Sequence, residues 1–216
     1  MIVSMWMSRD LITITPETLL TEASAMMARK HIRRLPVIEY HAGTPYPVGI
    51  ITATDILHAY PPDINPFAVT ARDAGQGRIT ASQIMSRVLQ TIEPETPIEE
   101  AARLMRNEKI STLLVVQKKK LAGLITESDI FRAFVKMLES TGGEVRITFD
   151  IANEEDAFYL IAPMAQKFAV HVASLMSVRQ NDRQLCVIRV AGANTQDLID
   201  ELWRSGHSVL NVLRLS

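Results

Sequence analysis

The string Thr-x-x-Asp occurs twice in this chain, and its two side chains are of types that could bind a phosphorylated sugar. Thr52 and Asp55 follow a glycine and an aliphatic pair, and so do Thr126 and Asp129. A Thr hydroxyl beside the free N–H groups of a helix start suits a phosphate or a sugar oxygen. An Asp carboxylate one turn later can accept hydrogen bonds from both hydroxyls of a ribose. The pattern therefore indicates a candidate binding site that is present in duplicate.

The same spacing also predicts a structural role. In a capping box, the Thr hydroxyl accepts from N–H groups of the first helical turn, and the acid three residues later reaches back. For a single occurrence this interpretation would be favoured. Both copies, however, follow a glycine, Gly49 or Gly123, and the lack of a Cβ lets a ligand or a backbone approach closely. The duplication favours a binding site, and the two roles can coexist.

The two strings belong to a longer internal repeat. Met7-Ser8-Arg9 and Met85-Ser86-Arg87 open the two copies at an offset of 78 residues (85 − 7 = 78), whereas Thr52 and Thr126 are offset by 74 (126 − 52 = 74). The first copy therefore carries four extra residues, which we expect in an exposed loop over 39–47. A repeat of this size is two copies of one supersecondary unit, each covering an apolar face of the other.

Apolar periodicity predicts the order β-α-β-β-α in both copies. The first copy is expected to hold a strand at 12–14, a helix at 19–30 capped by Thr18, strands at 35–38 and 48–51, and a helix from Thr52. The second is expected to hold a strand at 90–92, a helix at 98–108, strands at 112–116 and 121–125 joined by a lysine turn, and a helix to 138. Pro61 to Gly77, rich in turn residues, reads as the connector.

The last third predicts a separate domain after a boundary at 141–143. Its expected elements are a strand at 145–149, a helix at 156–168, a hairpin of 170–178 with 185–190, a helix at 195–204 and a strand at 209–213. This β-α-β-β-α-β order is that of a ferredoxin-like split unit.

Composition excludes several classes of protein. The 216 residues carry a formal net charge of −1 with 22% charged and 47% hydrophobic residues, a profile typical of a globular protein without a nucleic-acid partner. Cys186 is the only cysteine and is flanked by aliphatic residues, so we expect it to be buried and inert. The N-terminus does not resemble a signal peptide and no window reaches the length of a membrane span. We therefore expect a cytoplasmic protein without a membrane partner.

Residues for catalysis do not converge in the sequence. The five histidines are scattered without metal-ligand spacing, and neither a P-loop nor a dinucleotide glycine fingerprint occurs. The acidic pairs lie in expected first helical turns, where they favour the helix dipole. We therefore expect neither an enzyme nor a metal site.

The repeated unit and its Gly-x-x-Thr-x-x-Asp strings resemble a tandem pair of CBS domains, the modules first named for cystathionine β-synthase. The resemblance covers about residues 1–140. It implies a cleft that binds adenosine compounds such as AMP, ADP, ATP or S-adenosylmethionine, with Asp holding the ribose and Thr or Ser near the ribose and phosphate. It also implies that each site takes contacts from the opening segment of the other copy.

Carried over residue by residue, the resemblance implies two sites. The first would use Thr52 and Asp55, with Ser86 and Thr91 beside the adenine and Arg33 and Arg34 at the phosphate. The second would use Thr126 and Asp129, with Ser8 and Thr13 opposite and Ser111 and Thr112 in place of the two arginines. Because Arg binds phosphate better than a hydroxyl does, we expect the first site to hold phosphorylated nucleotides and the second to be weaker. The alternative is that the arginines are only surface charge.

The C-terminal third resembles an ACT-type regulatory domain, and the whole resembles acetoin-utilisation AcuB-type proteins. The fold class is thus α+β, a CBS pair followed by a ferredoxin-like βαββαβ ACT-type domain, with boundaries expected at 1–62, 63–80 (connector), 81–140 and 144–216. ACT domains commonly bind amino acids, but the segment 150–156 is acidic and lacks the usual glycine.

The resemblance, together with the lack of convergent catalytic residues, implies a non-enzymatic homodimer that senses adenosine nucleotides, in the manner of an energy sensor, and acts on an unidentified enzyme. Whether Mg²⁺ accompanies an ATP ligand is left open. The alternatives are an amino-acid sensor acting through the ACT-like domain and an accessory subunit of a metabolic enzyme without a ligand of its own.

Overall fold

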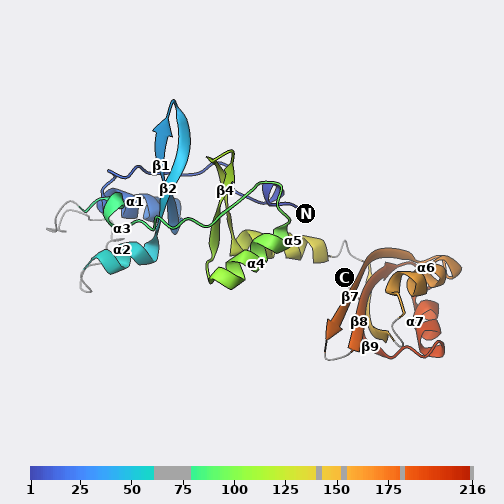
Figure 1. The fold of residues 1–216 in the computed structure, drawn as a ribbon. Coiled ribbons are helices and arrows are strands. Elements are labelled where there is room, and N and C mark those ends of the chain that lie inside the picture. Colours follow the sequence, from blue (N-terminus) through green and yellow to red (C-terminus); the bar gives the residue numbers. More distant parts are fainter. Residues whose placement is uncertain (61–78, 140–142, 152–154, 181–182, 215–216) are drawn as a thin grey trace. The chain divides into compact units, whose positions relative to one another are not determined.

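The computed structural model describes residues 1–60, 79–139, 143–151, 155–180 and 183–214. These divide into two compact units, Met1–Met137 and Leu138–Ser216, each of which mixes helices and strands (Figure 1). The expected boundary at 141–142, most of the connector and the turn at 181–182 lie outside the described residues.

The first repeat of the N-terminal unit is built on a two-stranded antiparallel sheet. Its elements are the 3-10 helix η1 (Val3–Met5), α1 (Leu20–Lys30), β1 (Arg34–His41), β2 (Thr44–Thr52) and α2 (Ala53–Ala59). The expected first strand is reduced to a single parallel bridge between Ile14 and Val37. The expected Thr18 cap is wrong, because Leu19 holds the N-cap position and the Thr18 hydroxyl accepts from the Thr15 N–H instead.

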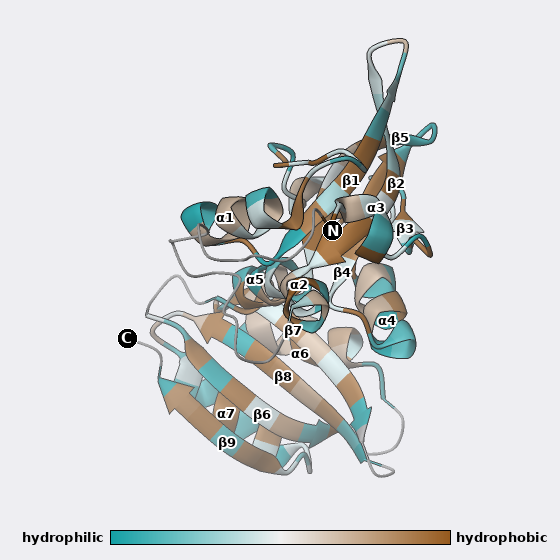
Figure 2. Ribbon diagram, turned by 90° about the vertical axis from the view of Figure 1, so that its left-hand side faces the viewer, coloured by the Kyte–Doolittle hydropathy of each residue, from teal (hydrophilic) through white to brown (hydrophobic). Residues whose placement is uncertain are grey.

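The second repeat follows the expected order in full. After α3 (Ala81–Ile84), it consists of β3 (Thr91–Ile92), α4 (Ile98–Glu108), β4 (Thr112–Gln117), β5 (Lys120–Thr126) and α5 (Glu127–Leu138). Its sheet order is β3-β4-β5, parallel for the first pair and antiparallel for the second. Figure 2 shows hydrophobic residues along β1, β2 and β4 and hydrophilic residues on α1 and α4, as expected for helices that cover a sheet.

The insert over 39–47 is not the loop that we expected. β1 and β2 extend through it as a hairpin whose two tip residues, Ala42 and Gly43, have φ of 50° and 76°. Lys118 and Lys119 form the equivalent tip of the second repeat with φ of 50° and 68°. Left-handed residues at both tip positions match the twist of a two-residue hairpin. Proline is tolerated here because a two-stranded sheet leaves one side of each strand without ladder partners.

The opening segments of the two repeats are exchanged between their sheets. Ser8 exchanges backbone hydrogen bonds of 2.9 and 3.0 Å with Leu124 of the second repeat. Ser86 exchanges bonds of 3.0 and 3.1 Å with Ile50 of the first. Each segment then returns to its own repeat, where Ile14 and Thr91 pair in parallel with β1 and β4. The exchange brings each opening segment beside the Thr-x-x-Asp string of the other repeat.

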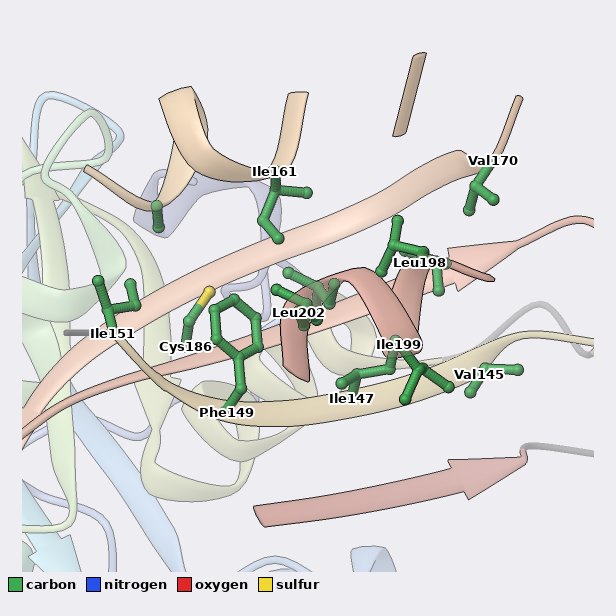
Figure 3. Packing of buried hydrophobic residues seen from close by; sticks show 13 residues of the cluster. Val145, Ile147, Phe149, Ile151, Ile161, Val170, Cys186, Leu198, Ile199 and Leu202 are labelled. Atoms are coloured by element: carbon green, nitrogen blue, oxygen red, sulfur yellow. The ribbon is translucent and has the colours of Figure 1, made fainter. Parts of the chain in front are cut away.

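The C-terminal unit has the predicted order of elements. These are β6 (Val145–Ile151), α6 (Ala157–Lys167), β7 (His171–Gln180), β8 (Arg183–Ala191), α7 (Thr195–Arg204) and β9 (Val209–Arg214), with an antiparallel sheet of order β7-β8-β6-β9. One face of the sheet packs against both helices. Figure 3 shows side chains of this core, including Phe149 from β6, Ile161 from α6 and Leu202 from α7.

Cys186 lies in this core as expected. Its side chain is fully buried beside Phe149 (Figure 3), and burial raises the pKa of its thiol to about 12. The thiolate that would react or bind a metal is therefore disfavoured at neutral pH.

Candidate functional site

The first Thr-x-x-Asp string forms a complete capping box at the start of α2. The Thr52 N–H and hydroxyl both donate to Asp55 Oδ2 at 2.7 Å, and the Asp55 N–H donates to Thr52 Oγ1 at 3.2 Å. The structural role considered for this string is therefore present. Asp55 Oδ1 has no hydrogen-bond partner among the residues that the structure describes, so it can still accept from a ligand.

The second string repeats this geometry but adds an arginine. The Thr126 N–H and hydroxyl donate to Asp129 Oδ2 at 2.9 and 2.8 Å. Arg132 Nη2 donates to Asp129 Oδ1 at 2.8 Å and to the Trp6 carbonyl at 3.1 Å. The guanidinium also lies 5.9 Å from the centre of the Trp6 ring. The Asp129 carboxylate is therefore largely buried and paired, and it is oriented more firmly than that of Asp55.

Asp129 borders a cavity of about 630 Å³, named here the Asp129 cavity. It is lined by the opening segment of the first repeat, the segment after α1, Ser111, the end of β5 and the start of α5. Its lining residues are Ser8, Asp10, Leu11, Ile12, His31, Ile32, Arg33, Arg34, Pro36, Ser111, Leu124, Thr126, Glu127, Ser128 and Asp129. Apolar walls, the Asp129 carboxylate and the side chains of His31, Arg33 and Arg34 thus meet around one space.

Asp55 borders a second cavity of about 330 Å³, the Asp55 cavity. It is lined by the equivalent segments with the repeats exchanged. Its lining residues are Arg34, Ile50, Thr52, Asp55, Ser86, Val88, Leu89, Gln90, Lys109, Ile110, Ser111, Thr112 and Leu114. Both volumes fall within the range of small-molecule sites, the smaller near its lower end.

The structure reverses one part of the predicted sites. Arg33 was expected beside Asp55, and Ser111 and Thr112 beside Asp129. Instead, Arg33 lines only the Asp129 cavity, and Thr112 lines only the Asp55 cavity. The reason is that the repeats face each other through β2 and β5, so the segment after the first helix of each repeat lies across from the other repeat's string.

Two other expected residues lie elsewhere. Thr13 is absent from the lining of both cavities, as is Thr91. Thr91 instead borders a third, open hollow of about 530 Å³ with Lys118 and Lys119. Thr13 directly precedes Ile14, and Thr91 itself pairs with β4, so both threonines lie where their segments return to their own sheets. Ser8 and Ser86, which lie before that point, reach the Asp129 and Asp55 cavities, respectively.

Sequence reasoning missed two acidic residues of the Asp129 cavity. Asp10 lies on the exchanged opening segment, and Glu127 directly follows Thr126. Their positions two residues after Ser8 and next to the Thr could have indicated them. Both oppose an anionic ligand, so the basic residues of this cavity act against a partly acidic background.

The glycines before the strings make room for methionines rather than for a ligand. A Cβ on Gly49 would overlap with Met85 Sδ. A Cβ on Gly123 would lie 2.7 Å from Met7 Sδ and 2.8 Å from the Ser8 carbonyl oxygen. Each glycine therefore admits the opening segment of the other repeat. Of the two neighbours expected at these glycines, a ligand or a backbone, the backbone of Ser8 lies at Gly123, whereas the Met85 side chain lies at Gly49.

Arg34 lies between the two cavities and lines both. It is the cross-strand neighbour of Thr52, and its Nη2 donates to the Ser111 hydroxyl. Burial and the nearby Arg33 lower the pKa of Arg34, while Glu127 opposes this shift. An arginine remains charged at neutral pH even so, which leaves a half-buried cation held by a neutral hydroxyl.

Two features are absent from the part of the chain that the structure describes. No group of three or more His, Cys, Asp or Glu residues there could hold a metal ion. No helix within the described ranges is long and apolar enough to cross a membrane.

Comparison with known proteins supports the geometry. The family described as CBS domain matches residues 3–62 and 81–136, together more than half of the chain. A CBS domain-containing protein of Dictyostelium discoideum is 34% identical over 139 residues, which are 64% of this chain and 94% of that protein.

Two solved structures are similar to the N-terminal unit. The first, from Vibrio cholerae, is provisionally assigned as an acetoin utilization protein (AcuB); it has a TM-score of 0.53 and 26% identity, and the match covers 64% of this chain and 93% of the other. The second is a CBS domain pair in complex with 5′-methylthioadenosine and S-adenosyl-L-methionine. It has a TM-score of 0.51 and 27% identity, and the match covers 63% of this chain and 97% of the other.

Proposed function

The chain belongs to the CBS-domain family, and we propose that it is a regulatory protein that binds adenosine nucleotides in the Asp55 and Asp129 cavities. One observation carries the proposal. Each cavity combines a carboxylate fixed at a helix start, an exchanged opening segment and apolar walls. The CBS domain pair solved with two adenosine compounds supports the choice of ligand class.

Each part of an adenosine ligand has a matching group in these cavities. Asp55 Oδ1 and the remaining lone pairs of Asp129 would accept hydrogen bonds from the ribose hydroxyls. Apolar residues such as Ile12 and Pro36 in one cavity, and Ile50 and Leu114 in the other, would enclose the adenine. The regulatory effect requires that the ligand binds one arrangement of the protein more tightly than another.

We assign the phosphorylated ligand to the Asp129 cavity, which reverses the expectation from sequence. This cavity has the larger volume and receives His31, Arg33 and Arg34 from one segment. Arg132 already neutralises Asp129, so the carboxylate repels a phosphate less. The Asp55 cavity, near the lower size limit and with only Lys109 and the shared Arg34 as cations, suits a nucleoside with less charge.

The test uses Asp55→Asn and Asp129→Asn, which keep an oxygen that can complete the capping box but remove the charge. Isothermal titration calorimetry with AMP and with adenosine is run on both variants and the unaltered chain. We expect Asp129→Asn to weaken the tighter AMP site by about tenfold or more, as for loss of a charged hydrogen bond, and Asp55→Asn to act mainly on adenosine. Thermal unfolding of both variants controls for folding.

Two outcomes would contradict the proposal. Unchanged affinities in both variants would show that the nucleotide binds elsewhere. No binding of AMP or adenosine at millimolar concentration would remove the sensing function altogether.

For the C-terminal unit we propose an ACT-type domain that transmits the bound state within a cytoplasmic homodimer. The β-α-β-β-α-β order and the sheet order β7-β8-β6-β9 support this assignment. The helix-free face of the sheet carries exposed apolar residues, including Met176 and Val178, which suit a contact surface. The same proposal includes an unidentified enzyme that the protein regulates and a role in acetoin utilisation.

A further inference from the structure

Only one cationic side chain serves both cavities in the part of the chain that the structure describes. Arg34 and its partner Ser111 line the Asp129 cavity and the Asp55 cavity alike, whereas Arg33 lines the first alone and Lys109 the second alone. Arg34 and Ser111 therefore form part of the wall between two spaces that we assign to similar ligands.

This arrangement breaks the symmetry of the repeat at one position. Arg34 and Thr112 are equivalent (112 − 34 = 78), and each is the cross-strand neighbour of the Thr of its own repeat. Thr112 is short and lines one cavity. Arg34 is long enough to line both, so one guanidinium is available for two anions.

We propose that Arg34 couples the two sites, so that a phosphate bound in one cavity weakens the binding of a phosphate in the other. This coupling depends on the proposed function. At rest Arg34 is held by the neutral Ser111 hydroxyl, a partner that a phosphate can replace with a stronger, charge-assisted bond. When the Arg34 guanidinium binds the phosphate in one cavity, it is oriented away from the phosphate in the other cavity. By linkage, the effect is the same whichever cavity is filled first.

The coupling has a chemical signature. It requires a phosphate on both ligands, so adenosine, which lacks one, does not show it. Arg33 does not contribute, since it borders only one cavity. The two arginines thus provide a matched pair of variants: Arg34→Thr copies the residue of the second repeat at Thr112, and Arg33→Ser copies Ser111.

The experiment compares AMP affinities by calorimetry. Asp129→Asn and Asp55→Asn first give the AMP dissociation constant of each cavity when binding in the other is weakened. The unaltered chain is then titrated through both steps. We expect the second step to be about five- to tenfold weaker than the weaker single cavity, within the usual range of coupling between sites.

The arginine variants decide the cause. In Arg34→Thr we expect both affinities to fall and the excess weakening of the second step to disappear, to within about twofold. In Arg33→Ser the excess weakening of the second AMP-binding step should persist. Titration with adenosine should show no such weakening in any variant.

Three results would overturn the coupling. An excess that persists in Arg34→Thr would assign the effect to direct repulsion between the phosphates. If the excess weakening of the second step disappears equally in Arg33→Ser, the effect comes from the total positive charge near the cavities rather than from Arg34. If the unaltered chain shows no excess weakening, the two sites bind AMP independently. Failure of the proposed function itself would appear earlier, as AMP affinities that neither asparagine variant changes.

Discussion

Thr112 and Thr126 are cross-strand neighbours with opposite hydrogen-bonding status. The Thr126 hydroxyl donates to Asp129 and accepts from its N–H. The Thr112 hydroxyl is buried and has no partner among the described residues. A buried hydroxyl without a partner lowers stability because its bonds to water are lost on folding.

Replacing this hydroxyl by a methyl group should therefore stabilise the protein. We expect Thr112→Val to raise the free energy of unfolding by about 1 kcal/mol and to leave AMP affinity unchanged, because the hydroxyl oxygen is sealed from the cavity. Thr126→Val, the matched control, should lower stability by about 1 kcal/mol through loss of the helix cap. Urea unfolding measures both. A fall in AMP affinity for Thr112→Val would instead show that the hydroxyl contacts the ligand.

Gly49 and Gly123 determine how closely the strands and the exchanged opening segments approach. The contact at Gly49 is with the side chain of Met85, which can move. That at Gly123 includes the Ser8 carbonyl oxygen, which belongs to a backbone bridge and cannot move without breaking it. An added methyl group should therefore cost more at the second position.

We expect Gly123→Ala to lower the free energy of unfolding by about 2 kcal/mol, within the usual cost of overpacking. The same change should weaken AMP binding at the Asp129 cavity, which Ser8 lines. Gly49→Ala should have a smaller effect. Chemical denaturation and calorimetry of the two variants provide the comparison, and equal losses would contradict the distinction between backbone and side-chain contacts.

The arrangement of strands and helices within each repeat could largely be predicted, because it depends on local apolar periodicity and on turn residues. The family model confirms the tandem CBS pair, and the chain has the mixed α+β fold expected. The hairpin over 39–47 was misread because its prolines and glycine also fit a loop. Which string the segment after each first helix faces could not be predicted, since it depends on the packing of β2 against β5 rather than on any local pattern.

The candidate site has the expected residue types and the expected serine beside each string, but the residues that follow the first helix of each repeat are paired the other way round. Asp55 and Asp129 each border a cavity, and the serines of the opening segments lie beside them. Arg33 was assigned to the wrong partner because spacing within a repeat does not reveal contacts between repeats. The role of these residues in binding remains a prediction.

The chain divides into two units, each with its own buried apolar residues. The core of the C-terminal unit contains Cys186, whose thiol has a pKa raised by burial from an ordinary value near 9.0 to about 12. At pH values between 9.0 and about 12, the Cys186 thiol loses its proton in the unfolded chain but keeps it in the folded chain. Stability therefore falls as the pH rises through this range and is unaffected by this group below it.

This linkage predicts how the unit responds to alkali. We expect the free energy of unfolding to fall more steeply above pH 9 in the unaltered chain than in Cys186→Ala, although the alanine variant is less stable throughout because it leaves a cavity. Urea unfolding at several pH values between 8 and 10.5 measures the slopes. Parallel slopes would show that the thiol ionises equally easily in the folded state.

The exchange of opening segments has a consequence for the origin of the molecule. A lone repeat with this geometry would leave the start of its own chain projecting and one strand of its sheet without the bridge that Ser8 or Ser86 supplies. It could complete itself only by trading those segments with another copy. Fusing two copies replaces a meeting of separate molecules, which depends on their concentration, with one inside a single polypeptide. Once fused, the halves no longer had to stay identical, and an arginine could arise on one side alone.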